Sequence, residues 1–262
     1  MVYAIFILIS FLASVIGCIC GIGGGVIIKP IMDAFHMYSV STISFMSGCI
    51  VLSMTAYSVI KTQLSHESVI EKGSSTWLGI GAALGGIAGK QLFDIIKTAS
   101  ENPDAVGAVQ AAALFALTLA TIIYTVNKSK IKTHSITSGA VCAVIGLALG
   151  MMSSFPGIGG GPINLVVLYF FFSMDTKTAA QNSLYIILIS QLVSLLFTIV
   201  TGAVPEFPAL LLGVMILCGI LGSVVGRKIN KKIDNAAVDK LFIGLLTVIM
   251  FVCVYNYMQF SR

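Results

Sequence analysis

Eight stretches of this chain contain no Asp, Glu, Lys or Arg, and this feature restricts the fold more than any other. Most of them reach the roughly 20 residues that a helix needs to cross a bilayer. Only 10% of all residues are charged, against about 25% in an ordinary soluble domain. We therefore expect an all-α polytopic membrane protein. The uncharged stretches are Val2–Ile28, Ala34–Ile60, Gly73–Gly89, Ala105–Asn127, Thr133–Met174, Thr178–Pro205, Phe207–Gly226 and Leu241–Ser261.

The pentad Gly-Ile-Gly-Gly-Gly occurs twice, as Gly21–Gly25 and as Gly157–Gly161. The same offset of 136 positions aligns identical residues further on: Phe35/Phe171, Thr42/Thr178, Ser47/Ser183, Ile50/Ile186 and Leu52/Leu188. Five consecutive matches followed by matches in register indicate an internal duplication, because shared apolar composition alone would not produce them. We expect two four-helix repeats, residues 1–127 and 135–262, joined by a basic linker at 128–134.

Each pentad is also where we expect a helix to break. A glycine inside a helix costs roughly 1 kcal/mol relative to alanine, so three consecutive glycines interrupt it. The stretch Thr133–Met174 would be about twice as long as the bilayer is thick if it formed one straight helix. We expect about eight transmembrane helices, with helices 1 and 5 broken at the pentads. The expected ranges are 2–20 with 26–36, 39–61, 76–96, 105–127, 135–155 with 162–172, 175–200, 207–228 and 238–257.

The orientation in the membrane follows less directly from the basic residues. If every helix crosses once, nine basic residues collect on one face and six on the other, which is a weak bias. The clusters Lys128–Lys132 and Arg227–Lys232 then lie on opposite faces, with both termini outside. A hairpin at either pentad would change this assignment. Residues 2–16 lack a basic n-region and a cleavage site, so we expect a retained first helix.

No catalytic or metal-binding pattern stands out. The cysteines lie in apolar stretches without paired spacing, so we interpret them as packing residues. His36, His66 and His134 show no metal spacing, and neither a Ser-His-Asp nor a nucleotide-binding motif is present. We therefore expect no enzyme activity, no cofactor, no metal and no nucleic-acid partner. The cysteines are Cys18, Cys20, Cys49, Cys142, Cys218 and Cys253.

The two breaks predict an anion site. A broken helix at membrane depth frees backbone N–H and C=O groups, which are tolerated only inside protein or a water-filled cavity. Breaks at matching positions of two repeats point to a transport site. The helices resuming at Val26 and Pro162 direct their first N–H groups and positive dipole ends at the break, which suits an anion. The alternative is a notch that only lets helices cross closely. The candidate backbone ligands are Gly23, Gly24, Gly25, Gly159, Gly160 and Gly161.

Polar side chains near the start of the following helix in each repeat can complete such a site. They are Ser44 and Ser47 in the first repeat and Gln181, Asn182 and Ser183 in the second. Their hydroxyl and amide groups donate hydrogen bonds to an oxyanion without adding fixed charge. The alternative is that they join neighbouring helices by hydrogen bonds.

Lys29 and Asp33 are one helical turn apart just after the first pentad. Charges inside a membrane are costly and usually functional. Lys29 is therefore a candidate anion attractor, with Asp33 as its partner or as a proton acceptor. The alternative is a pair that neutralises itself near the interface.

With these features the chain resembles the TauE/SafE family of membrane permeases over nearly its whole length. The resemblance rests on Gly21–Gly25 with Pro30 shortly after, on Gly157–Gly161, and on Ala179–Ser183, which is similar to the family's A-x-x-[TN]-S helix start. The first repeat departs from that pattern at Ile43–Ser47, and Lys29 stands where the family usually has an aliphatic residue. The resemblance implies transport of sulfite, thiosulfate, sulfoacetate or another organosulfonate.

We therefore expect a secondary transporter in the cell membrane that moves a small sulfur-containing oxyanion through a site between the two repeats. An anion channel is the alternative. The sulfur anion, the direction of transport and the coupling ion stay open. A homodimer through the glycine-rich faces of residues 76–96 or 207–228 also stays open.

Overall fold

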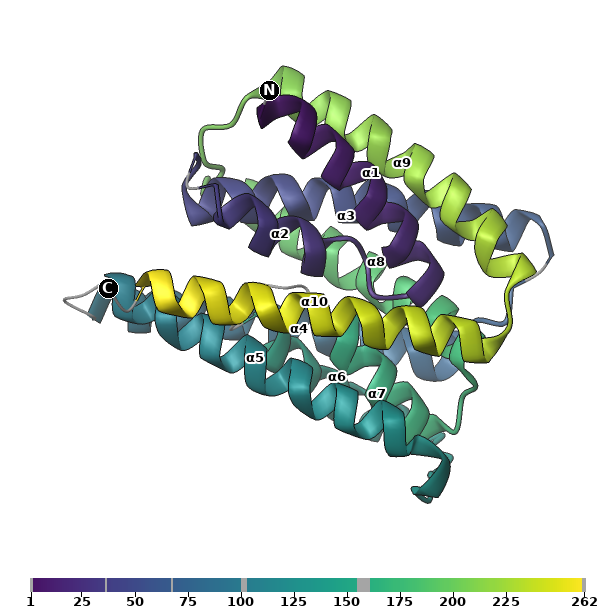
Figure 1. Ribbon diagram of the computed structural model, residues 1–262. Helices are drawn as coiled ribbons and strands as arrows, with labels where there is room; N and C mark the ends of the chain where they lie inside the picture. The colour runs from purple at the N-terminus through teal and green to yellow at the C-terminus, as the bar shows by residue number, and fades with distance from the viewer. Residues whose placement is uncertain (1, 36, 67, 100–102, 155–160, 261–262) are drawn as a thin grey trace.

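The computed structural model describes residues 2–35, 37–66, 68–99, 103–154 and 161–260. These residues form ten α-helices and one short 3-10 helix, without a strand in the described ranges, so the expected all-α class is confirmed (Figure 1). The elements are α1 (Val2–Cys20), α2 (Gly25–Asp33), α3 (Val40–Leu64), α4 (Lys72–Ala99), α5 (Pro103–Asn127), η1 (Lys128–Lys130), α6 (Gly139–Ser154), α7 (Gly161–Phe172), α8 (Thr176–Val200), α9 (Ala209–Lys232) and α10 (Asn235–Phe260).

Capping residues fix the starts of the two central helices. Ser39 precedes α3, and its hydroxyl accepts a hydrogen bond from Thr42 N at 3.2 Å. Asp175 precedes α8, and its carboxylate accepts from Lys177 N and Thr178 N, both at 3.0 Å. A side-chain oxygen at this position satisfies an N–H group that the first helical turn leaves without a partner. Both helices therefore begin directly after a small polar residue that caps them.

Glycines let several helices approach each other closely. A Cβ atom at Gly85 or Gly146 of the α4–α6 pair would overlap the backbone of Leu147 or Leu78. Helices α1 and α9 also approach each other closely, since a Cβ atom at Gly222 would lie only 2.5 Å from Phe11 O. Such small-residue contacts are a common way to pack membrane helices. These glycine-mediated contacts lie within the chain, and the homodimer through residues 76–96 or 207–228 stays a prediction.

The outer surface and the helix lengths suit a bilayer. Six described helices are long and apolar enough to span it, namely α1, α3, α5, α8, α9 and α10. The apolar helices α6 and α7 are shorter. Large apolar side chains are exposed on the outside, including Leu210, Val200 and Phe251, which are 86%, 84% and 73% exposed. An exposed apolar surface of this extent fits lipid contact. The expected number of eight spanning helices stays a prediction.

Both short helices turn the chain back toward the end it came from. Figure 1 shows α2 folded back beside α1, so that α3 begins near the end where α1 begins. At the end of α7, Ser173 Oγ donates to His134 O at 2.9 Å, which holds that end against the linker.

The basic linker lies at the same end of the molecule as the end of α9. Lys128 Nζ lies 2.6 Å from Asp239 in the first turns of α10, which follows α9 directly. The expectation that the clusters Lys128–Lys132 and Arg227–Lys232 face opposite sides was therefore wrong. Its physical reason is the fold-back of α7, which adds one change of direction between the linker and the end of α9.

Candidate functional site

The first glycine pentad breaks the helix by adopting left-handed backbone conformations. Gly21 and Gly23 have φ angles of 75° and 66°, a region that residues with a Cβ atom rarely adopt. Every residue of Gly21–Gly25 is buried. A Cβ atom on Gly21 would overlap the backbone of Ala180 in α8. The pentad is therefore both a break and a close backbone contact with the other half of the chain.

The helix that resumes after this break points its amino end into the interior. Gly24 is the cap residue of α2 and has no side chain that could satisfy the first N–H groups. Gly24 O accepts from Ile28 N at 3.0 Å, and Gly24 N is directed at Met54 Sδ at 3.3 Å. A thioether sulfur is a weak acceptor. The amino end of α2 thus presents donors and a positive dipole end to the protein interior.

The described part of the second pentad lies against the first. A Cβ atom on Gly161, the first residue of α7, would overlap the backbone of Ile22. The two regions of broken helix therefore touch where the structure describes both. The predicted ligands Gly159 and Gly160 lie outside the described residues.

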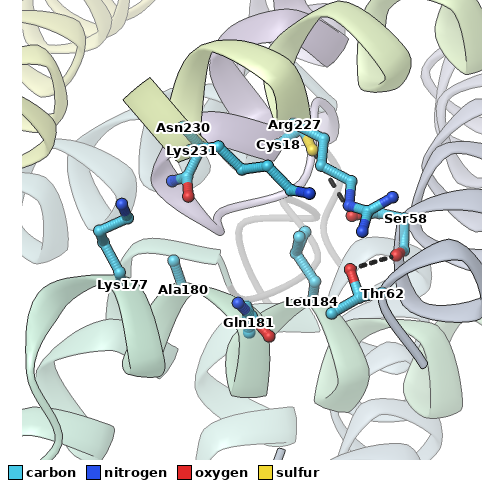
Figure 2. A pocket seen from close by; sticks show the side chains of 10 residues that line it. All are labelled: Cys18, Ser58, Thr62, Lys177, Ala180, Gln181, Leu184, Arg227, Asn230 and Lys231. Carbon is cyan, nitrogen blue, oxygen red and sulfur yellow. Dashed lines mark hydrogen bonds between the residues drawn. The ribbon is translucent and has the colours of Figure 1, made fainter. Parts of the chain in front are cut away.

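A polar cavity of about 350 Å³ opens next to the first break. Figure 2 shows α9 on one side of it, carrying Arg227, Asn230 and Lys231, and α8 on the other. Three of its side chains are cations, and none of the described residues that line it is a carboxylate. The cavity therefore favours a small anion on electrostatic grounds. Its lining residues are Cys18, Ser58, Thr62, Lys177, Ala180, Gln181, Leu184, Arg227, Asn230 and Lys231. We call this cavity the α9 cavity.

Hydrogen bonds hold the polar walls of the α9 cavity in place. Arg227 donates to Ser65 Oγ at 3.0 Å, and Lys177 Nζ donates to Ile233 O at 3.0 Å. Ser58 Oγ lies 3.5 Å from Cys18 Sγ. Asn230 donates to Ile19 O at 2.7 Å, which satisfies a carbonyl group in the last turn of α1. Guanidinium, ammonium, hydroxyl and amide groups thus surround a volume large enough for a small oxyanion.

A second cavity, of about 200 Å³, lies toward the opposite end of α3 and α8. Its polar wall includes Lys29, Ser44, Lys90 and Gln191, and Lys90 Nζ donates to Thr198 Oγ1 at 3.3 Å. We call it the α4 cavity, because Lys90 belongs to α4. A space of about 50 Å³ lined by Asn164 and Ser190 adjoins it, and the two share four lining residues. The shared residues are Gly86, Ser154, Gln191 and Ser194.

The predicted side-chain ligands are divided between the two cavities. Lys29 and Ser44 line the α4 cavity, whereas Gln181 lines the α9 cavity. Ser47 and Ser183 are buried and line neither cavity. Ser183 Oγ has no hydrogen-bond partner within the described part of the chain. The structure therefore does not gather these five residues into one shell.

Asn182 is buried in a hydrogen-bond network that joins α8 to the segment before α4. Its side-chain oxygen accepts from Glu71 N at 2.9 Å and from Ser75 Oγ at 2.6 Å. Its amide nitrogen donates to Val69 O at 3.1 Å and to Thr178 O at 2.9 Å. Both donors and both lone pairs are thus occupied. In this conformation Asn182 positions the loop and offers no hydrogen bond to a ligand.

Sequence reasoning missed the cations and hydroxyls of the α9 cavity. In the sequence, basic residues such as Arg227 serve only as markers of orientation, because their helix ends look like ordinary membrane borders. A signal was present for Ser58 and Thr62, since the offset of 136 aligns them with the identical residues Ser194 and Thr198. Extending the repeat alignment beyond Leu52 identifies both pairs, Ser58/Ser194 and Thr62/Thr198.

The comparison with protein families agrees with the fold. A family model described as Sulfite exporter TauE/SafE matches residues 6–252. No curated protein and no solved structure matches the chain. The matched range begins in α1 and ends in α10, so it includes both pentads and both cavities.

Proposed function

The chain belongs to the sulfite exporter TauE/SafE family, and we propose that it is a secondary transporter that moves a small sulfur-containing oxyanion across the cell membrane. The family is one of membrane transporters of sulfur anions. Sulfite, thiosulfate, sulfoacetate and other organosulfonates are the candidate substrates. The pathway runs between the two halves of the chain, past the first pentad.

The observation that carries this proposal is the charge of the α9 cavity. Its three cations, Lys177, Arg227 and Lys231, come from two helices, and the part of the lining that the structure describes contains no carboxylate. Cations at a partly enclosed, low-dielectric site attract and hold anions more strongly than cations in water. An arginine beside hydroxyl groups matches the geometry of an oxyanion such as a sulfonate. The cavity also touches the first break through Cys18 and Ala180.

The helix pairing supports a pathway between two repeats. An offset near 136 relates α1 to α6 and α4 to α9, so the α1–α9 and α6–α4 pairs are counterparts. Gly85 of α4 packs on Leu147, and its counterpart Gly222 of α9 packs on Phe11. Phe11 and Leu147 are again 136 positions apart. Each half thus packs its α4 or α9 helix against the first helix of the other half, and the two contacts correspond.

The basic residues support an orientation with the α9 cavity toward the cytoplasm. Among the described residues, eleven lysines and arginines lie at the side of the molecule that holds the linker. Lys29, Lys90 and Lys97 lie toward the other side. Short cytoplasmic loops carry an excess of Lys and Arg. The start of α1 and the end of α10, which Figure 1 shows at the opposite side, are then external. The eleven are Lys61, Lys72, Lys128, Lys130, Lys132, Lys177, Arg227, Lys228, Lys231, Lys232 and Lys240.

Among the residues predicted from the sequence, we assign the anion to backbone N–H groups of the two pentads, with Gln181 on one side and Lys29 with Ser44 on the other. Each of these three side chains lines a cavity. Ser47 in α3 and Ser183 in α8 are buried and become ligands only if the helices move. Asn182 serves the pathway as a positioning residue through the hydrogen bonds described above.

A binding panel tests the substrate class. Purified protein is titrated with sulfite, thiosulfate, sulfoacetate, taurine and acetate, and the shift in its thermal unfolding temperature is measured. A ligand that binds only the folded state raises this temperature. We expect a rise with at least one sulfur oxyanion and none with acetate. A response to acetate alone would refute the sulfur assignment.

A further inference from the structure

The two cavities are lined by equivalent positions of the two repeats. The offset of 136 that aligns the pentads also relates seven residues of the α9 cavity to seven of the α4 cavity. An eighth pair, Lys90 and Arg227, is related by 137. Shared apolar composition does not explain this match, because most of these residues are polar or small. The seven pairs are Cys18/Ser154, Ser41/Lys177, Ser44/Ala180, Phe45/Gln181, Gly48/Leu184, Ser58/Ser194 and Thr62/Thr198.

The hydrogen bonds in the two cavities correspond as well. Thr62 Oγ1 donates to Ser58 O at 2.8 Å, and Thr198 Oγ1 donates to Ser194 O at 2.9 Å. Each cavity also places a cation beside the end of the opposite long helix. Arg227 reaches Ser65 just past the end of α3, and Lys90 reaches Thr198 in α8. A cation with two hydroxyl-bearing residues is therefore the common element of both cavities.

The two cavities are at opposite ends of α3 and α8. Along α3, Ser44 and Gly48 line the α4 cavity, and Ser58 and Thr62 line the α9 cavity. Along α8 the order is reversed, with Ala180 and Leu184 in the α9 cavity and the residues from Gln191 to Thr198 in the α4 cavity. The two helices therefore run antiparallel, and the repeats have inverted topology. This is the arrangement in which one half can adopt the conformation of the other.

A buried apolar contact lies between the cavities. A Cβ atom on Gly23 would be 3.3 Å from Val51 Cγ1 and 3.5 Å from Ile187 Cδ1. Val51 and Ile187 are themselves equivalent positions of the two repeats and are 3% and 1% exposed. Each lies between the two cavity-lining segments of its own helix. The first pentad thus sits where the two halves meet, against one matching residue from each.

We propose that the α9 and α4 cavities are the two mouths of one anion pathway, each binding a sulfur oxyanion through its cation and its pair of hydroxyl groups. Arg227 acts with Ser58 and Thr62 at one mouth. Lys90 acts with Ser194 and Thr198 at the other. The contact of Gly23 with Val51 and Ile187 closes the passage between them. This inference rests on the proposed function, because it names how that pathway is built.

Uptake measured separately from each face tests the two mouths. Full-length protein in oriented proteoliposomes is assayed for the KM of labelled sulfoacetate presented on either side. We expect Arg227→Gln to raise the KM from the α9 face by roughly ten-fold or more, which is the scale of a lost charge-assisted hydrogen bond. Lys90→Gln should raise it from the α4 face instead. Arg227→Lys and Lys90→Arg should restore much of the affinity.

Lys228→Gln is the matched control, because Lys228 neighbours Arg227 but is exposed and lines neither cavity. It should transport like the unchanged protein. If both Gln variants keep the normal KM on both faces while transport continues, the two-mouth proposal is refuted and the transporter assignment stands. The two-mouth proposal is also refuted if either Gln variant raises the KM equally on both faces.

A second measurement separates this proposal from the choice of substrate. Thr62→Cys and Thr198→Cys are treated in vesicles with a membrane-impermeant thiol reagent, and the unchanged protein gives the background from native cysteines. We expect labelling from opposite faces. Labelling of both from one face, or of neither above background, overturns the two-mouth proposal. If no sulfur anion is transported by the unchanged protein, the proposed function fails, and this labelling still decides whether two mouths exist.

Discussion

At the scale of single residues, Gly21 occupies a position that only glycine fits without strain. Its φ angle of 75° is combined with backbone contact to Ala180. A left-handed conformation costs a residue with a Cβ atom roughly 1–2 kcal/mol, and overlap with Ala180 adds to this. Gly21→Ala should therefore lower the thermal unfolding temperature of the purified protein markedly. Gly213→Ala is the control, since a Cβ atom there meets no atom within 4 Å, and it should be neutral or slightly stabilising.

Asp175 gives a prediction that depends on pH. Burial raises the pKa of Asp175, but hydrogen bonds from Thr178 and Lys177 outweigh it, and the pKa is lowered overall. Its stabilising effect is then complete above the ordinary carboxyl pKa of about 3.9 and is lost as pH falls through the lowered folded-state value.

Asp175→Ala should cost about 1 kcal/mol at neutral pH, and Asp175→Asn, which keeps a capping oxygen, should cost less. Unfolding temperatures measured from pH 7 down to pH 3 check this. Equal stability of all three proteins at neutral pH would contradict the assigned cap.

At the scale of elements, the two close helix pairs should respond alike to the same change. Gly85→Ala in α4 and Gly222→Ala in α9 each push a methyl group into the backbone of a partner helix. Overpacking of this kind costs about 1–3 kcal/mol. Both variants should therefore lose stability by similar amounts, measured as folded yield after heating. Gly244→Ala in α10, where a Cβ atom meets nothing within 4 Å, should keep the normal yield.

The helices could be predicted from the sequence because their borders are local. Ser39 and Asp175 cap α3 and α8 close to the expected starts, and the pentads break helices for reasons of backbone conformation. The direction of α2 and α7 could not be predicted, because glycines mark a break without fixing the angle. From the sequence Asn182 is either a ligand or a link between helices. Its hydrogen-bond partners decide how it is used, and three of the four are more than 100 positions away in the chain.

The cavities could not be predicted from the sequence for a different reason. Arg227 and Lys90 belong to different helices and become parts of a cavity only through tertiary packing. For Arg227 this is the packing of α9 on α1 and α3, and for Lys90 it is the packing of α4 on α6 and α8. The repeat itself still carried part of the information, because Ser58/Ser194 and Thr62/Thr198 are identical at the offset of the pentads.

At the scale of the whole molecule, the fold-back of α2 and α7 predicts the topology. The linker and the end of α9 should face the cytoplasm, and the start of α1 and the end of α10 should face the outside. Lys130→Cys, in the exposed part of the linker, should react with an impermeant thiol reagent in inside-out vesicles only. A tag following α10 should be accessible in intact cells. Reaction of both positions from the same side would contradict the fold-back.

The central claim is that a sulfur oxyanion binds between the two halves and crosses by alternating access. Counterflow tests it most directly. Proteoliposomes loaded with unlabelled sulfoacetate or sulfite are diluted into a trace of the labelled anion, with empty vesicles alongside. The account predicts transient accumulation of label that depends on the internal anion. Anion conductance without such accumulation would show a channel, and the absence of any flux would contradict the account altogether.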